Sequence, residues 1–265
     1  MDGLDGGLLD APTIELIQFR YSHFNEKARW GLDWKGVPHT RRSLLPGPHM
    51  PTIRRLTGQT GTPVVRFGQR FVHGSARILE QLETRYPDPP LLPRDPAQRR
   101  RALEIQAHFD DVVGPAVRCA LFSELLDEPD YVCGMFASGK PRLTRALYRA
   151  TFPVVKPLMK KGNGVTSRAA IDAAFEATNA ALDFVAANAG DRSYLAGPAF
   201  SVADLAAASL LAICTNPDHP DMKRPEPMPA SMQAWLARWA DHPGTAWVRE
   251  IYARHRGAPG ATPPA

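Results

Sequence analysis

The sequence is poor in cysteine and has no long apolar stretch. Its 265 residues include three cysteines, Cys119, Cys133 and Cys214, an odd number without paired spacing. This pattern argues against a disulfide framework and suits a reducing cytoplasm. No apolar run is long enough to cross a bilayer, and residues 1–12 lack a basic start followed by an apolar core. We therefore predict a cytoplasmic protein with no membrane span and no signal peptide.

Motifs for metals, phosphates and nucleic acids are also lacking. The eight histidines form no metal-ligand spacing with cysteine or carboxylate, so we expect no metal site, and we expect His219 to be exposed in a proline-rich loop. No phosphate-binding glycine motif and no Gly-x-Ser-x-Gly motif occurs. The net charge is +5, but the basic residues are scattered, with one run at 98–101 and no interleaved aromatics. Nucleic acid is therefore not an expected partner.

The most informative motif present is Thr62-Pro63-Val64-Val65, followed by Gly74-Ser75. A proline at the head of an apolar strand cannot donate to a sheet, so Pro63 marks a strand start or edge. The next strand is expected to end at His73, and Ser75 then opens a helix. Strand, turn, strand and serine-capped helix form the second half of a thioredoxin-type domain, in which we expect a cis Thr62–Pro63 bond. Free backbone beside Pro63 and a helix N-terminus at Ser75 suit a small peptide with a carboxylate.

The first half of this domain can also be predicted. A mostly apolar strand is expected at 13–19, a helix at 25–36 ending at a glycine, a second strand at 39–45 and a short helix at 50–56. In the first helix one face is small and apolar, and tryptophans form a second. The charged positions of this helix are expected in solvent: Glu26, Lys27, Arg29 and Asp33.

The remaining chain has the pattern of a helical bundle. We predict a thioredoxin-like domain at 13–86, a proline-rich linker at 87–96, an all-helical domain at 97–256, and flexible tails at 1–12 and 257–265. Helices are expected near 96–126, in part of 141–160, and near 167–188, 201–214, 230–240 and 245–255. Residues 127–165 are interrupted by prolines. We expect this segment to form a helix that extends the second domain over the active cleft, and we favour this interpretation over a role at a membrane surface.

Taken together, these motifs resemble the glutathione transferase superfamily over most of the chain. The matches are Ser22 ahead of Lys27-Ala28-Arg29, the stretch 62–65, Gly74-Ser75 before Ile78-Leu79, and the stretch 200–205. In the last motif Ser201 and Asp204 form a capping box, so Asp204 is expected to be structural. The resemblance implies glutathione as co-substrate, a small apolar electrophile as second substrate, and a homodimer.

The resemblance also implies a thiolate-stabilising residue. Ser22 lies five residues before Lys27, the spacing that serine-type transferases use, and its hydroxyl would donate a hydrogen bond to the glutathione sulfur. Tyr21 is the rival donor, because another branch of the family uses tyrosine. A plain turn or cap serine is the structural alternative for Ser22. Asn25 is expected to cap the helix.

Further residues are implied in glutathione binding. Ser75 would bind the γ-glutamyl carboxylate through its hydroxyl and the helix-start amides, and Thr62, beside Pro63, would pair its backbone with the cysteinyl unit. Family members usually carry Glu or Asp before this serine, where this chain has Gly74. Without this acid, glutathione binding is weakened, or the amino group of glutathione is bound by Asp110 or by a residue of a partner subunit.

The glycyl carboxylate has three candidates. His49 lies near where some classes carry a basic residue, with Arg54 and Arg55 as alternatives. Two functions remain open: a glutathione transferase, and a catalytically idle binding protein with the same fold. A third possibility keeps the fold and uses glutathione for isomerisation or reductive dehalogenation.

Overall fold

A mixed four-stranded sheet forms the core of the N-terminal part. The computed structural model describes residues 14–189 and 194–257, and the tails predicted to be flexible lie almost wholly outside this range. The strands are β1 (Glu15–Gln18), β2 (Thr40–Ser43), β3 (Val64–Phe67) and β4 (Arg70–His73), in the order β2-β1-β3-β4. β1 is parallel to β2 and antiparallel to β3, which is antiparallel to β4.

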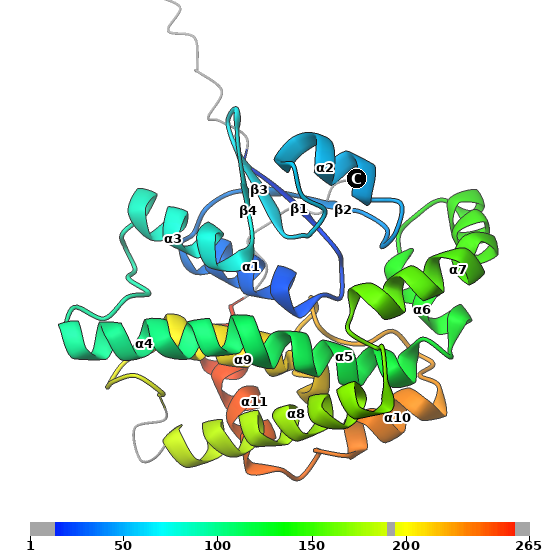
Figure 1. Cartoon of the computed structure of the whole chain (residues 1–265). Coiled ribbons are helices and arrows are strands. Elements are labelled where there is room, and N and C mark those ends of the chain that lie inside the picture. The colour runs from blue at the N-terminus through cyan, green and yellow to red at the C-terminus, as the bar shows by residue number, and fades with distance from the viewer. Residues whose placement is uncertain (1–13, 190–193, 258–265) are drawn as a thin grey trace, which may run out of the picture.

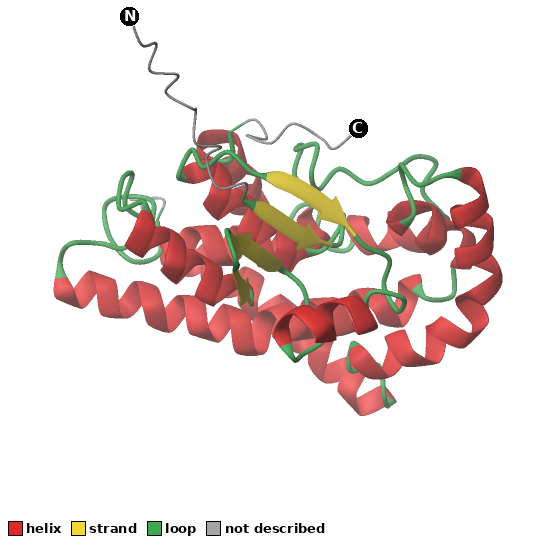
Figure 2. Ribbon diagram, turned by 90° about the horizontal axis from the view of Figure 1, so that it is seen from above, coloured by secondary structure: helices red, strands yellow, loops and turns green. Residues whose placement is uncertain are grey.

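Both faces of this sheet are covered by helices. Successive strand residues point to opposite faces, so Leu16 and Val65 join the larger core, while Ile17 and Val64 pack with Ile53. The larger core includes α1 (His23–Trp34) and α3 (Ser75–Arg85), and Ile53 belongs to α2 (Met50–Thr57) on the other face. Figure 1 shows α2 above the sheet and α1 below it, and Figure 2 shows the strands from above.

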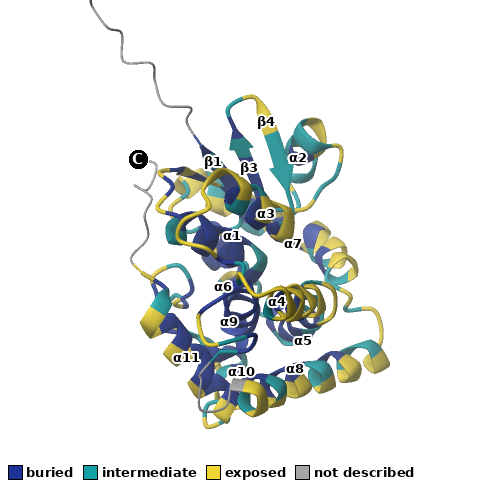
Figure 3. Cartoon of the chain, turned by 90° about the vertical axis from the view of Figure 1, so that its left-hand side faces the viewer, coloured by how far each residue is buried: buried dark blue, intermediate teal, exposed yellow. Residues whose placement is uncertain are grey.

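The C-terminal part is helical. Its elements are α4 (Pro96–His108), the short π-helix η1 (Phe109–Val113), α5 (Gly114–Leu125), α6 (Pro129–Phe136), α7 (Arg142–Gly162), α8 (Arg168–Ala189), α9 (Val202–Thr215), α10 (Ala230–Ala237) and α11 (Pro243–His255). Every residue of α9 is buried, and this helix packs against α1, α4, α5 and α11 (Figure 3). The predicted class, a thioredoxin-like α/β domain followed by an all-α domain, is confirmed. Among the described residues no helix is both long and apolar enough to cross a membrane.

Helix α7 differs from the interrupted segment that the prolines suggest. It runs unbroken from 142 to 162, with Pro153 and Pro157 inside it. A proline removes one helix hydrogen bond and crowds the preceding turn, but α7 buries four side chains on its inner face, which holds it in place: Tyr148, Phe152, Val155 and Met159.

The position of α7 over the first domain is as predicted. The Tyr148 hydroxyl donates to the Pro46 carbonyl oxygen at 3.1 Å, and Lys140 Nζ, just before the helix, donates to the Ser43 carbonyl oxygen at 2.7 Å. Residues 127–165 therefore extend the helical domain over the loop that follows β2.

Two predictions about the first helix are wrong. The helix begins at His23, because Ser22 has an extended backbone and its carbonyl oxygen accepts the Glu26 N–H at 2.8 Å. Asn25 therefore lies inside the first turn and cannot be the cap. The charged side chains of Glu26, Lys27 and Arg29 are buried, because α1 is covered by the helical domain on the side away from the sheet.

Candidate functional site

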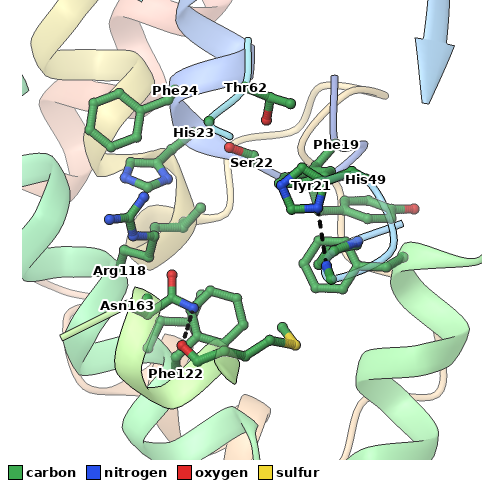
Figure 4. Close-up of a pocket in the computed structure, with 18 of the residues that line it drawn as sticks. Phe19, Tyr21, Ser22, His23, Phe24, His49, Thr62, Arg118, Phe122 and Asn163 are labelled. Atoms are coloured by element: carbon green, nitrogen blue, oxygen red, sulfur yellow. Dashed lines mark hydrogen bonds between the residues drawn. The ribbon is translucent and has the colours of Figure 1, made fainter. Parts of the chain in front are cut away.

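A cavity of about 270 Å³ lies between the two domains, and we call it the interdomain pocket (Figure 4). One wall comes from the thioredoxin-like domain and the other from the helical domain. The first wall includes Phe19, Tyr21, Ser22, His23, Phe24, Gly47, His49, Met50 and Thr62, and the second includes Arg118, Leu121, Phe122, Met135, Phe136, Met159, Asn163, Ile213 and Arg224.

Ser22 lies at the N-terminus of α1 and lines this pocket. It occupies the N-cap position, with φ −100° and ψ 129°, yet its side chain makes no capping hydrogen bond. Within the described chain, its hydroxyl has no other hydrogen-bond partner. The hydroxyl is thus free to donate into the pocket, beside the positive end of the helix dipole.

Thr62 lies close to Ser22 at the top of the pocket in Figure 4. The Thr62–Pro63 bond is cis, as expected. Over the residues that the structure describes, the Thr62 backbone N–H and carbonyl have no partner, so both are available to an extended peptide. Asn25 supports this segment, because its Nδ2 donates to Thr62 Oγ1 at 3.2 Å.

Ser75 and Gly74 lie at the start of α3, outside the pocket lining. Gly74 is the N-cap residue and Ser75 the first helical residue, and the Gly74 N–H donates to the Pro63 carbonyl oxygen at 3.0 Å. This bond ties the start of α3 to the Thr62–Pro63 turn. Gly74 has φ +87° and open space where a Cβ would stand, so an acidic residue here would fit sterically with a strained backbone.

His49 lines the pocket, but both of its ring nitrogens are engaged. Nδ1 accepts the Gly47 N–H at 3.1 Å, so the proton lies on Nε2, which donates to the Thr60 carbonyl oxygen at 2.9 Å. Burial lowers the His49 pKa. A neutral imidazole bonded in this way would have to give up a hydrogen bond to reach a carboxylate. Arg54 and Arg55 are exposed, in the last turn of α2.

Tyr21, the rival donor, is buried and lines the same pocket. The guanidinium of Arg20 lies 5.7 Å from its ring centroid. Ser22 and Tyr21 are therefore brought into one cavity, and their order as thiol donors stays a prediction.

Asp110 is already occupied by Lys27. Both carboxylate oxygens accept from Lys27 Nζ, at 2.6 and 2.7 Å, and the Lys27 side chain is fully buried. This ion pair joins α1 to the π-helix η1 of the helical domain. Asp110 would have to leave that cation before it could bind the amino group of glutathione.

The capping box at Ser201 and Asp204 is present as predicted. Ser201 Oγ accepts the Ala203 N–H, and Asp204 accepts the backbone N–H groups of Ser201 and Leu195 at 2.9 and 2.8 Å. Burial raises the Asp204 pKa to about 6. Asp204 thus connects the start of α9 to the preceding loop.

Six charged side chains form a second buried region, which we call the buried charge cluster. Arg256 donates to Glu26 at 2.8 Å, to Asp33 at 2.8 Å and to Asp221 at 2.9 Å. The other contacts complete the set: Arg29 to Glu26 at 2.7 Å, and Arg41 to Asp221 at 2.8 Å and Asp33 at 3.0 Å. The cluster therefore balances three guanidinium groups with three carboxylates.

His219 borders this cluster and is buried, so its expected exposure is wrong. Ligand atoms of Glu26, His219 and Asp221 lie within 4.8 Å of one another, a spacing that could suit a cation. However, arginines already neutralise both carboxylates, and their positive charges oppose a metal ion. The loop folds inward because Asp221 pairs with Arg29, Arg41 and Arg256.

Two charged residues of the pocket were not predicted: Arg118 and Arg224. Arg118 is a lone charge in an apolar part of α5, a pattern that could have identified it. Arg224 lies in the loop between α9 and α10, where nothing in the local sequence marks it. His23, also in the lining, donates to the Gly114 carbonyl oxygen at 2.9 Å, and burial, together with the charge of Arg118, lowers its pKa to about 3.

The comparisons with known proteins agree with this architecture. The family of glutathione S-transferase N-terminal domains matches residues 16–90, and the family of glutathione S-transferase C-terminal domains matches residues 143–242. None of the curated proteins matches the chain. The two domain matches, in this order and on this fold, show that the chain belongs to the glutathione S-transferase superfamily.

Solved structures with the same fold include FzlA from C. crescentus, at 23% identity, 96% coverage of each chain and a TM-score of 0.53. A glutathione S-transferase from Methylobacterium radiotolerans, in complex with glutathione sulfonate, is 22% identical over 91% of each chain, with a TM-score of 0.57. The theta class glutathione S-transferase from Xanthomonas axonopodis pv. citri, with glutathione bound, is 22% identical, with a TM-score of 0.54, and covers 88% of this chain and 95% of that chain. At these identities the likeness shows the fold alone.

Proposed function

We propose that this chain is a glutathione transferase in which the Ser22 hydroxyl stabilises the glutathione thiolate. The fold and both domains support a glutathione-transferase-type function. The observation that carries the proposal is the Ser22 hydroxyl, which lines the interdomain pocket at a helix N-terminus and is not used as a cap.

The chemistry requires a thiolate. An ordinary thiol has a pKa of about 8.5, and lowering it by two units takes about 2.7 kcal/mol of preferential stabilisation of the anion. A hydroxyl hydrogen bond and the N-terminal end of α1 both act in this direction. The thiolate would then attack the electrophilic atom of the second substrate, and the leaving group would depart with its electron pair.

Glutathione would lie along the Thr62–Pro63 turn. The free Thr62 backbone groups support pairing with the cysteinyl unit, and the start of α3 at Ser75 supports binding of the γ-glutamyl carboxylate. His49 remains a weaker candidate for the glycyl carboxylate, since its ring is already bonded to the loop. A homodimer, as in much of the family, remains part of the proposal.

The decisive experiment is Ser22→Ala. We expect glutathione affinity by calorimetry to stay nearly unchanged, the pKa of the bound thiol to rise, and turnover of an aryl halide to fall about 100-fold or more. Tyr21→Phe is the matched control and should leave both the thiol pKa and turnover close to native. A large loss of turnover in Tyr21→Phe, together with native turnover in Ser22→Ala, would assign the donor role to Tyr21.

The second candidate is an idle binding protein with this fold. Gly74 favours it, because the acid that usually meets the glutathione amino group is missing and Asp110 is paired with Lys27. If the native protein neither binds glutathione at millimolar concentration nor turns over any electrophile, this candidate replaces the transferase.

A further inference from the structure

Two arginines in the helical wall of the interdomain pocket have no anionic partner among the residues that the structure describes. Arg224 is 3% exposed; its Nη1 lies 3.4 Å from the Met135 sulfur, its Nη2 lies 3.5 Å from the Ile213 carbonyl oxygen, and its Nε has no partner. Arg118 Nε is also buried without a partner, and its guanidinium carbon lies 5.6 Å from the Phe24 ring centroid. Figure 4 shows Arg118 between His23 and Asn163.

The surroundings supply no compensating charge. In the part of the chain that the structure describes, neither guanidinium forms an ion pair, and the pocket lining includes no Asp or Glu. Burial lowers the pKa of both arginines, yet a guanidinium stays protonated at physiological pH. A buried charge is costly unless it is paired. The pocket therefore contains two positive charges that an incoming anion would neutralise.

We propose that these two arginines bind a carboxylate group on the second substrate. The inference rests on the proposed function, because glutathione would occupy the Ser22 and Thr62 side, whereas Arg118 and Arg224 belong to the opposite, helical side. Apolar neighbours, among them Leu121, Phe122 and Ile213, suit the carbon skeleton of that substrate. The expected class is thus a small hydrophobic electrophile with a carboxylate, in place of a wholly apolar one. Guanidinium matches a carboxylate by two parallel hydrogen bonds.

His23 does not alter this charge count. Its Nε2–H is used by the Gly114 carbonyl oxygen, and with its low pKa the ring is neutral. The Nδ1 of this neutral ring carries no proton and cannot donate to an anion, so selectivity for a carboxylate depends on the two arginines.

A matched pair of glutathione conjugates tests the proposal. S-(para-carboxybenzyl)glutathione and S-benzylglutathione differ by one carboxylate on the benzyl ring. We expect calorimetry to show that the native protein binds the carboxylated conjugate at least about 10-fold more tightly than S-benzylglutathione. This is the scale for hydrogen bonds to a charged group. Arg118→Met and Arg224→Met should each remove most of this preference and leave S-benzylglutathione affinity unchanged. Arg20→Met, an exposed arginine beside Tyr21 but outside the lining, is the control and should keep the preference.

Several outcomes would overturn the inference. Equal binding of the two conjugates would do so, as would a preference that survives both substitutions. A matching fall in the affinity for glutathione itself would instead assign the arginines to one of its own carboxylates. Arg224→Lys keeps the charge at the fully buried position and should retain part of the preference, which separates loss of charge from loss of folding.

Failure of the proposed function gives a different result. If neither conjugate nor glutathione binds, para-nitrobenzoate and para-nitrobenzamide are compared without glutathione. Binding of the benzoate alone, lost in Arg118→Met, would keep the carboxylate site and end the transferase proposal. Absence of any benzoate binding would end the inference as well.

Discussion

The buried charge cluster and the interdomain pocket both contain buried arginines, but they differ in the groups that surround these arginines. In the cluster three guanidinium groups meet three carboxylates at hydrogen-bonding distance. In the pocket the two guanidinium groups meet, within the described part of the chain, only a sulfur, a carbonyl oxygen and an aromatic ring. A balanced set of charges is complete in the folded chain, whereas an unbalanced set becomes complete only with a ligand.

The location of each region agrees with this distinction. The cluster joins α1 and β2 of the first domain to Asp221 and Arg256 of the second, so it fixes one domain against the other. The pocket arginines border an open cavity beside Ser22. We therefore expect substitutions in the cluster to change stability and substitutions in the pocket to change binding.

The largest expected effect is that of Arg256→Met. This change leaves the carboxylates of Glu26, Asp33 and Asp221 partly uncompensated in a buried setting, and removing one partner of a buried ion pair costs about 3–5 kcal/mol. We expect the free energy of unfolding to fall by that amount in denaturant titration.

A matched control lies two residues away. Arg254 forms an exposed pair with Glu250 at 3.2 Å on α11, and Arg254→Met should change stability by no more than about 0.5 kcal/mol. Equal effects of the two substitutions would contradict the structural role of the cluster.

The second expected effect is the pH dependence of the cluster. Burial alone would raise the Asp221 pKa, but Arg29, Arg41 and Arg256 outweigh it and hold the pKa at about 2, below the ordinary value of 3.8. Because the folded pKa is depressed, the stabilisation is present above pH 3.8 and is lost as the pH falls towards 2. We expect a loss of about 2 kcal/mol over this window. Unfolding of Asp221→Asn, measured over the same pH range, should lack this part of the slope.

Asp204 provides an intermediate case. It is a buried carboxylate that pairs with no cation among the described residues. The backbone N–H groups of Leu195 and Ser201 hold it, and its pKa is raised where that of Asp221 is lowered. Asp204→Ala should lower the free energy of unfolding by about 0.5–2 kcal/mol, the range for losing a helix cap. Glutathione affinity of the folded variant should be unchanged. A sharp fall in affinity with an unmoved melting temperature would give Asp204 a role in binding.

Local patterns were sufficient to predict the fold but not the burial of charge. The strand around Val64, the cis bond at Pro63 and the capping box at Ser201 follow from neighbouring residues, and all three are present. Glu26 and Arg29 have the helical spacing of solvated residues, and their burial depends on Asp221 and Arg256, about 200 residues away in sequence.

The candidate site was predictable to the same extent. Ser22, Thr62 and Ser75 could be placed from motifs within one domain. Arg118 and Arg224 could not, because the helical domain brings them to the pocket and only the tertiary structure shows that they lack partners. The internal bonds of His49 likewise depend on the loop conformation at Gly47 and Thr60.

The smallest expected effect on stability is that of Arg118→Met. The side chain makes no ion pair with any described residue, and its Nε is buried without a partner, so methionine removes an uncompensated charge and fills similar space. We expect the free energy of unfolding to stay within about 0.5 kcal/mol of native or to rise. Adding para-nitrobenzoate should raise the melting temperature of the native protein and leave that of Arg118→Met unmoved, because a ligand stabilises only the state that binds it. A loss of more than about 2 kcal/mol in the free variant would show that Arg118 has a structural role after all. The buried charge cluster and the interdomain pocket would then differ only in the groups that surround their arginines, and the pocket arginines would no longer require a ligand.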